Sequence, residues 1–122
     1  MQEVPVEIEL YCTKHGEIPV KTFLDSLDPK MRAKTVMVIQ LLEEYGNVLR
    51  EPYSKHLENG LFELRIQQSS QITRIIYFFF RGDKAILTNG FIKKTQKTPG
   101  AEIRKAILYR QDYLKRKEKG DE

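Results

Sequence analysis

The chain of 122 residues is poor in the residue types that build metal and disulfide sites. It has one cysteine, Cys12, two histidines, His15 and His56, and no tryptophan. A single cysteine excludes an intramolecular disulfide and a multi-cysteine zinc site. Two histidines alone are a poor basis for structural zinc. We therefore expect a cytoplasmic protein.

Long hydrophobic runs are also missing. The N-terminus lacks the cationic segment and apolar segment of a secretory signal. The most apolar stretch, residues 72–80, is short and contains Arg74, whereas a membrane helix needs about 20 apolar residues. We expect no membrane-spanning segment.

The standard catalytic motifs are absent too. The sequence has no glycine-rich phosphate loop, paired-cysteine motif, G-x-S-x-G elbow or H-E-x-x-H motif. Its acidic residues do not form the D-x-D pattern that a two-metal nuclease favours. We predict no metal site and no cofactor.

What is present is an uneven distribution of charge. Residues 1–60 hold 7 Lys or Arg and 10 Asp or Glu, whereas residues 61–122 hold 14 and 7, for a net charge of +4. A basic half can attract polyanions at long range, although a solvated Lys/Arg surface would give the same numbers. The charge distribution suggests that the protein binds nucleic acid, but it does not establish this.

Hydrophobic periodicity predicts a single α+β domain over residues 1–122, in the order β-α-α-β-β-β-α. Alternation predicts a first strand within residues 4–11, and Pro19 and Asp28-Pro29 are typical helix starts. Three strand-like runs with short turns, an antiparallel meander, occupy residues 61–67, 72–80 and 84–91. Thr98-Pro99 is expected to cap a last helix, with residues 115–122 as a charged tail.

Two arginines fall within these predicted strands. Arg74 interrupts an apolar strand face, and Arg65 lies on the strand before it. A charge there is costly unless it is paired or opens into a groove. An ion pair with Glu63 is the structural explanation for either arginine, and phosphate binding is the functional one.

Three lysines, Lys93, Lys94 and Lys97, crowd the turn before the last helix. Like charges so close repel one another unless an anion lies between them. Together with the two arginines they favour phosphate binding, because a guanidinium grips phosphate bidentately and lysine adds a mobile charge.

An aromatic residue and a histidine lie near these cations. Phe91 is placed to stack on an RNA base, although core packing is the commoner role for such a residue. His56, beside Lys55, titrates near neutral pH and so suits proton transfer, although it could equally be an ordinary loop residue.

Three strings in this order form a recognisable pattern: residues 55–65 (KHLENGLFELR), 73–77 (TRIIY) and 89–99 (NGFIKKTQKTP). Over residues 5 to about 113 the chain resembles the phage-derived, HigB-like branch of the RelE/ParE toxin superfamily. The resemblance implies a twisted antiparallel sheet, with two N-terminal helices on one face and the C-terminal helix toward the other.

The resemblance also implies an activity. It implies the toxin of a type II toxin–antitoxin system, a ribosome-dependent, metal-independent endoribonuclease that cleaves mRNA. The expected catalytic residues are Arg65, Arg74, Lys93 and His56, with His56 or Lys55 as the general base. The expected RNA-binding residues are Lys55, Phe91, Lys94 and Lys97.

The implied partners are the ribosome, mRNA and a HigA-like helix-turn-helix antitoxin. Toxin and antitoxin would form a heterotetramer that binds promoter DNA through the antitoxin. Two alternatives stay open, because a fold does not fix a function. One is a ParE-like inhibitor of a target such as gyrase, and the other is a plain RNA-binding module.

Overall fold

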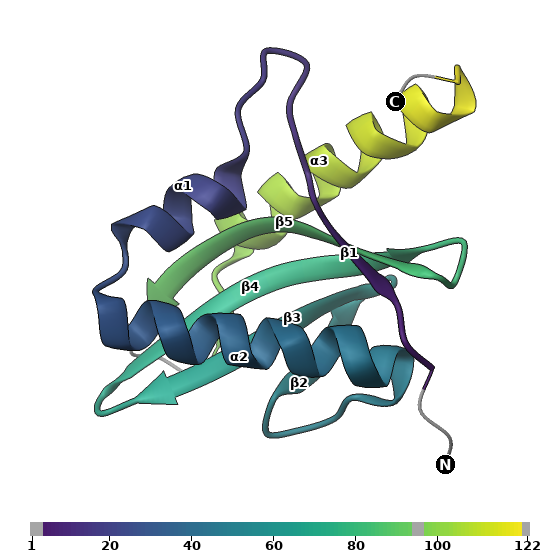
Figure 1. Ribbon diagram of the computed structural model, residues 1–122. Coiled ribbons are helices and arrows are strands. Elements are labelled where there is room, and N and C mark those ends of the chain that lie inside the picture. The colour runs from purple at the N-terminus through teal and green to yellow at the C-terminus, as the bar shows by residue number, and fades with distance from the viewer. Residues whose placement is uncertain (1–3, 94–96, 121–122) are drawn as a thin grey trace.

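The computed structural model describes residues 4–93 and 97–120. Within these ranges the chain forms one five-stranded sheet and three α-helices (Figure 1). In chain order the elements are β1 (Glu7–Leu10), α1 (Pro19–Ser26), α2 (Pro29–Tyr45), β2 (Ser54–Glu58), β3 (Leu61–Gln68), β4 (Gln71–Phe80), β5 (Lys84–Lys93) and α3 (Gly100–Glu118). The predicted α+β class is confirmed.

The strands lie in the order β1-β5-β4-β3-β2. Strands β2 to β5 pair antiparallel with their neighbours, as the predicted meander requires. β1 instead runs parallel to β5, with Glu7 opposite Lys84, so the sheet is mixed rather than wholly antiparallel. A parallel pair needs a long connection between its strands, and α1, α2 and strands β2 to β4 supply it.

β2 is an additional strand that the hydrophobic pattern does not predict. Its five residues, Ser-Lys-His-Leu-Glu, are mostly exposed and show little apolar alternation. It lies at the outer edge of the sheet, and among the described residues it pairs only with β3. Backbone pairing rather than burial defines it, and the observed order is therefore β-α-α-β-β-β-β-α.

Helices α1 and α2 cover one face of the sheet (Figure 1). As predicted, Asp28 caps α2, because its side chain accepts a hydrogen bond from the Met31 N–H at 2.9 Å. α1 packs on β5 at Gly90, where a Cβ would lie 2.4 Å from the Phe23 ring. The buried core between these helices and the sheet consists of Val6, Val20, Leu27, Met31, Val38, Leu42, Leu64, Ile66, Ile75, Tyr77, Ala85 and Leu87.

Helix α3 covers the opposite face of the sheet (Figure 1). Its buried residues Ala106 and Tyr113 pack on the alternate side chains of the same strands, including Leu61, Ile76 and Ile86. The charged segment predicted as a tail from residue 115 continues the helix as far as Glu118. The last turn carries three basic residues, which suit the negative end of a helix.

Candidate functional site

The two arginines predicted from the sequence lie side by side on the α3 face of the sheet. Arg65 of β3 is the register partner of Arg74 of β4. Glu63, two residues before Arg65 on the same face, lies between them. Its Oε2 is 3.5 Å from Arg65 Nε, and its Oε1 is 3.8 Å from Arg74 Nη1.

Burial separates the roles of these two arginines. The side chains of Arg74 and Glu63 are 0% and 1% exposed, whereas that of Arg65 is 16% exposed. Burial lowers the pKa of Arg74 below the usual arginine value, and the negative charge of Glu63 opposes this shift. The ion pair considered from the sequence is therefore present, and only Arg65 reaches the surface.

Thr98 connects this ion pair to the start of α3. Its hydroxyl donates to Glu63 Oε1 at 2.5 Å and accepts from Arg74 Nη1 at 3.4 Å. The sequence predicted that Thr98 would cap the helix, but Pro99 is the N-cap residue and makes no side-chain cap. The hydroxyl is instead occupied by the buried pair, because a buried carboxylate and guanidinium need further hydrogen bonds.

A second polar contact joins α3 to the sheet. Asn89 of β5 is buried and donates to the Glu102 carboxylate at 2.9 Å and to the Glu102 carbonyl at 3.2 Å. Together with the contacts of Thr98, this contact ties the start of α3 to the sheet.

The predicted residues around this segment are placed as follows. Phe91 is half-buried, lies opposite Arg74 in the β4–β5 register and packs against the apolar cluster under α3. Lys93 is the last residue of β5, Lys97 is exposed just before α3, and Lys94 lies outside the described residues.

The other two predicted residues, Lys55 and His56, are neighbours on β2 and face opposite sides of the sheet. Lys55 is the register partner of Glu63, so it lies on the face of the two arginines. His56 points to the other face, where its ring centroid is 5.1 Å from that of Phe62. The sheet therefore brings Lys55 to the arginine cluster and does not bring His56 there.

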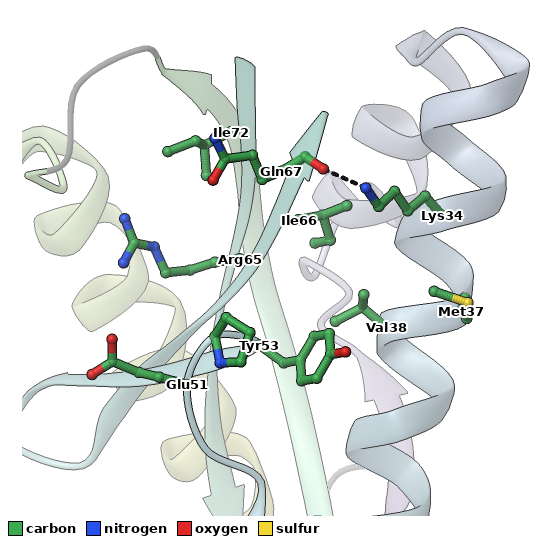
Figure 2. Close-up of a pocket in the computed structure, with 10 residues that line it drawn as sticks. Lys34, Met37, Val38, Glu51, Tyr53, Arg65, Ile66, Gln67 and Ile72 are labelled. Atoms are coloured by element: carbon green, nitrogen blue, oxygen red, sulfur yellow. Dashed lines mark hydrogen bonds between the residues drawn. The ribbon is translucent and has the colours of Figure 1, made fainter. Parts of the chain in front are cut away.

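A pocket of about 350 Å³ adjoins Arg65 at the outer edge of β3 (Figure 2). Lys34 of α2 reaches across it and donates a hydrogen bond to the Gln67 carbonyl. The residues that line the pocket are Lys34, Met37, Val38, Glu51, Pro52, Tyr53, Arg65, Ile66, Gln67 and Ile72. Apart from Arg65, the sequence offered no local signal for these residues, because they come from α2, a loop and two strands.

The family comparison matches most of the chain. The model of the family described as "Phage derived protein Gp49-like" matches residues 22–110. The chain belongs to this family. It is a family of toxin-like proteins. A search of the curated proteins found no match.

The part of this Gp49-like chain that matches the family model contains the site. It includes Glu63, Arg65, Arg74 and Thr98 and the pocket at the edge of β3. β1 and the last turns of α3 lie outside it.

Residues 4–93 and 97–120 contain no group of three His, Cys, Asp or Glu side chains that could hold a metal ion. No helix of this Gp49-like chain within these ranges is long and apolar enough to cross a membrane.

Proposed function

We propose that this Gp49-like protein is the toxin of a type II toxin–antitoxin system, close to the HigB-like branch of the RelE/ParE superfamily. It acts in the cytoplasm as an endoribonuclease that cleaves mRNA on the ribosome without a metal ion. The observation that supports this most directly is the position of Arg65. Its guanidinium is held against buried Glu63, remains partly exposed and lines a pocket.

The proposed reaction uses the RNA's own nucleophile. The ribose 2′-oxygen attacks the adjacent phosphorus, the bond from phosphorus to the 5′-oxygen breaks, and the products are a 2′,3′-cyclic phosphate and a 5′-hydroxyl. Arg65 and Lys93 stabilise the charge that develops on the phosphate oxygens, a form of electrostatic preorganisation that often dominates catalysis. The ribosome supplies alignment, which can lower a barrier by several kcal/mol.

The general base is better sought at Lys55 than at His56. Lys55 lies opposite Glu63 on the arginine face, whereas His56 packs beside Phe62 on the other face. Lys55, in its neutral amine form, would take the proton of the 2′-hydroxyl, and the leaving 5′-oxygen would take a proton from solvent water. Lys97 and Phe91, which flank the segment before α3, would hold the RNA backbone and a base.

Arg74 has an indirect part in this proposal. It is fully buried beside Glu63 and Thr98, so RNA cannot reach it in this arrangement. It holds Glu63 in place, and Glu63 in turn orients Arg65.

The partner is expected to be a helix-turn-helix antitoxin of HigA type. An acidic surface on the antitoxin would complement the basic half of the chain, and such complementarity speeds association. The heterotetramer and its binding to promoter DNA remain part of the same proposal.

Substitution of Arg65 tests the proposed activity. Arg65→Ala should reduce cleavage of ribosome-bound mRNA by about 100-fold or more, the usual effect of losing one oxyanion donor, and should abolish growth arrest. Arg65→Lys keeps the charge without the forked geometry and should retain an intermediate activity. Circular dichroism and thermal melting check that the variants are folded.

Arg81→Ala is the matched control, because Arg81 lies in the β4–β5 turn, 4.8 Å above the Phe80 ring. It should leave cleavage unchanged. Full cleavage by folded Arg65→Ala would refute the phosphate role of Arg65. Growth arrest by the wild type with intact mRNA would favour the non-enzymatic inhibitor, and RNA binding with neither effect would favour the binding module.

A further inference from the structure

The outer edge of β3 is only partly covered. β2 pairs with β3 from Leu61 to Leu64, and just beyond this pairing the Arg65 N–H donates to the Tyr53 carbonyl at 2.9 Å. Within the described ranges 4–93 and 97–120, residues 66–68 pair with β4 on one side and with no strand on the other. Ile66 and Gln67 of this open edge line the pocket in Figure 2.

The backbone at this edge points its polar groups outward. In an antiparallel strand, alternate residues direct their N–H and C=O groups to the same side. The Arg65 N–H points outward to Tyr53, so the N–H of Gln67 points outward as well. Its carbonyl also points outward, because it accepts the hydrogen bond from Lys34. Such an edge is a template for one more strand.

The two sides of this edge differ in chemistry. Figure 2 shows Met37 and Val38 of α2 on one side of β3, and Arg65 with Glu51 on the other. Met37 is 50% exposed and Tyr53 is 40% exposed, so both offer apolar surface beside this edge. A strand laid on the edge would direct alternate side chains to these two sides.

We propose that the edge of β3 at residues 66–68 binds an extended acidic segment of a partner protein as an added strand. Apolar side chains of this segment cover Met37 and Val38, and its acidic side chains, alternating with them, face Arg65. The acidic choice follows from charge, because Lys34 and Arg65 outnumber Glu51 in the lining. The incoming backbone N–H replaces the Lys34 ammonium on the Gln67 carbonyl.

Such a segment would cover Arg65 and so silence the site. That consequence rests on the proposed function, whereas the binding itself does not. The test therefore measures binding without any RNA.

The probe is a fluorescein-labelled octapeptide in which valine and glutamate alternate, and its binding to the full chain is measured by fluorescence anisotropy. We expect saturable binding in the millimolar range or tighter, with the amide signals of residues 66–68 shifting in NMR spectra. A peptide alternating valine and lysine should bind at least about fivefold more weakly, because it meets Lys34 and Arg65 with like charge.

Gln67→Pro removes the outward N–H without touching the β4 pairing, and proline is tolerated at such edge positions. It should weaken binding about tenfold, the effect of losing one hydrogen bond. Gln67→Thr, which keeps the N–H, should bind like the wild type. Thermal melting checks that both variants are folded.

A second pair of variants tests the apolar side independently of the backbone. Met37→Glu should weaken binding, whereas Val36→Glu, on the same helix but outside the pocket lining, should not. The proposal is wrong if no binding is seen at millimolar peptide or if the lysine peptide binds equally well. It is also wrong if folded Gln67→Pro matches Gln67→Thr, or if Met37→Glu matches Val36→Glu. If the wild-type protein does not cleave mRNA in a separate assay, the proposed nuclease activity is refuted, whereas the peptide-binding results still hold.

Discussion

Beneath α1 and α2 the sheet presents a broad apolar layer that includes Leu64, Ile66 and Ile75. Beneath α3 the alternate residues of the same strands include Glu63 and Arg74, both almost completely buried. An apolar layer stabilises without fixing directions, whereas a buried ion pair is weak evidence for stability but holds its groups in one geometry. The α1/α2 face therefore serves mainly to hold the fold together, and the α3 face serves to position Arg65.

The largest effect is expected from breaking the buried pair on one side only. Glu63→Ala leaves the Arg74 guanidinium buried without its carboxylate and should cost about 3–5 kcal/mol of unfolding free energy. It also removes the group that orients Arg65, so mRNA cleavage should fall together with stability. Urea unfolding and the cleavage assay measure the two losses.

The double variant Glu63→Leu/Arg74→Met separates these two losses. Replacing a buried ion pair by apolar residues is often neutral for stability, so we expect near wild-type unfolding with cleavage still lost. If this variant cleaves mRNA normally, the buried pair has no positioning role and the contrast between the two faces fails.

A substitution in the core on the α1/α2 face should lower stability without changing cleavage. Leu64 is fully buried in the core beneath α2, and Leu64→Ala should cost about 2–5 kcal/mol through lost burial and the cavity left behind. Cleavage per folded molecule, measured well below the midpoint of thermal unfolding, should remain unchanged. A clear loss of specific activity in the folded variant would show that this face also shapes the site.

The smallest effect is expected at the end of α3. Asp112 accepts a hydrogen bond from the Tyr11 hydroxyl at 2.5 Å and pairs with Arg116 at 2.9 Å, and these contacts hold the pKa of Asp112 below its usual value. A lowered pKa in the folded state stabilises the protein above the usual pKa of aspartate, and this contribution disappears as the pH falls through the lowered value.

Asp112→Asn should therefore lower stability at pH 7 by less than about 1 kcal/mol, because the carboxylate is more than a third exposed. The difference from the wild type should vanish at acidic pH, below the lowered pKa. Thermal melts at several pH values provide the measurement. A difference that grows as the pH falls would contradict the sign derived above.

Much of the fold could be predicted because its signals are local. The Asp28-Pro29 start of α2 and the alternation in β3 depend on neighbouring residues alone. The parallel pairing of β1 with β5 and the polar edge strand β2 depend on distant partners, so hydrophobic periodicity does not reveal them. Long-range pairing is the information that a single sequence carries least clearly.

The residues of the candidate site could also be predicted only in part. Arg65, Arg74 and their ion pair with Glu63 could be inferred from a charge on an apolar strand face. The face of the sheet on which His56 lies could not be inferred, because this face depends on the register of β2, a strand that the hydrophobic pattern did not predict. Thr98 resembles a helix cap in sequence, and only the structure shows that its hydroxyl donates to the buried Glu63 carboxylate instead.

The pairing of β1 with β5 also has a consequence for synthesis of the chain. During translation β1 leaves the ribosome before the other strands, and its partner strand β5 follows only after α1, α2 and the strands β2, β3 and β4. Contacts between such distant segments form late and slow folding. The sheet that carries Arg65 is thus completed only after β5 has been synthesised, and until then β1 lacks its partner strand on the nascent chain.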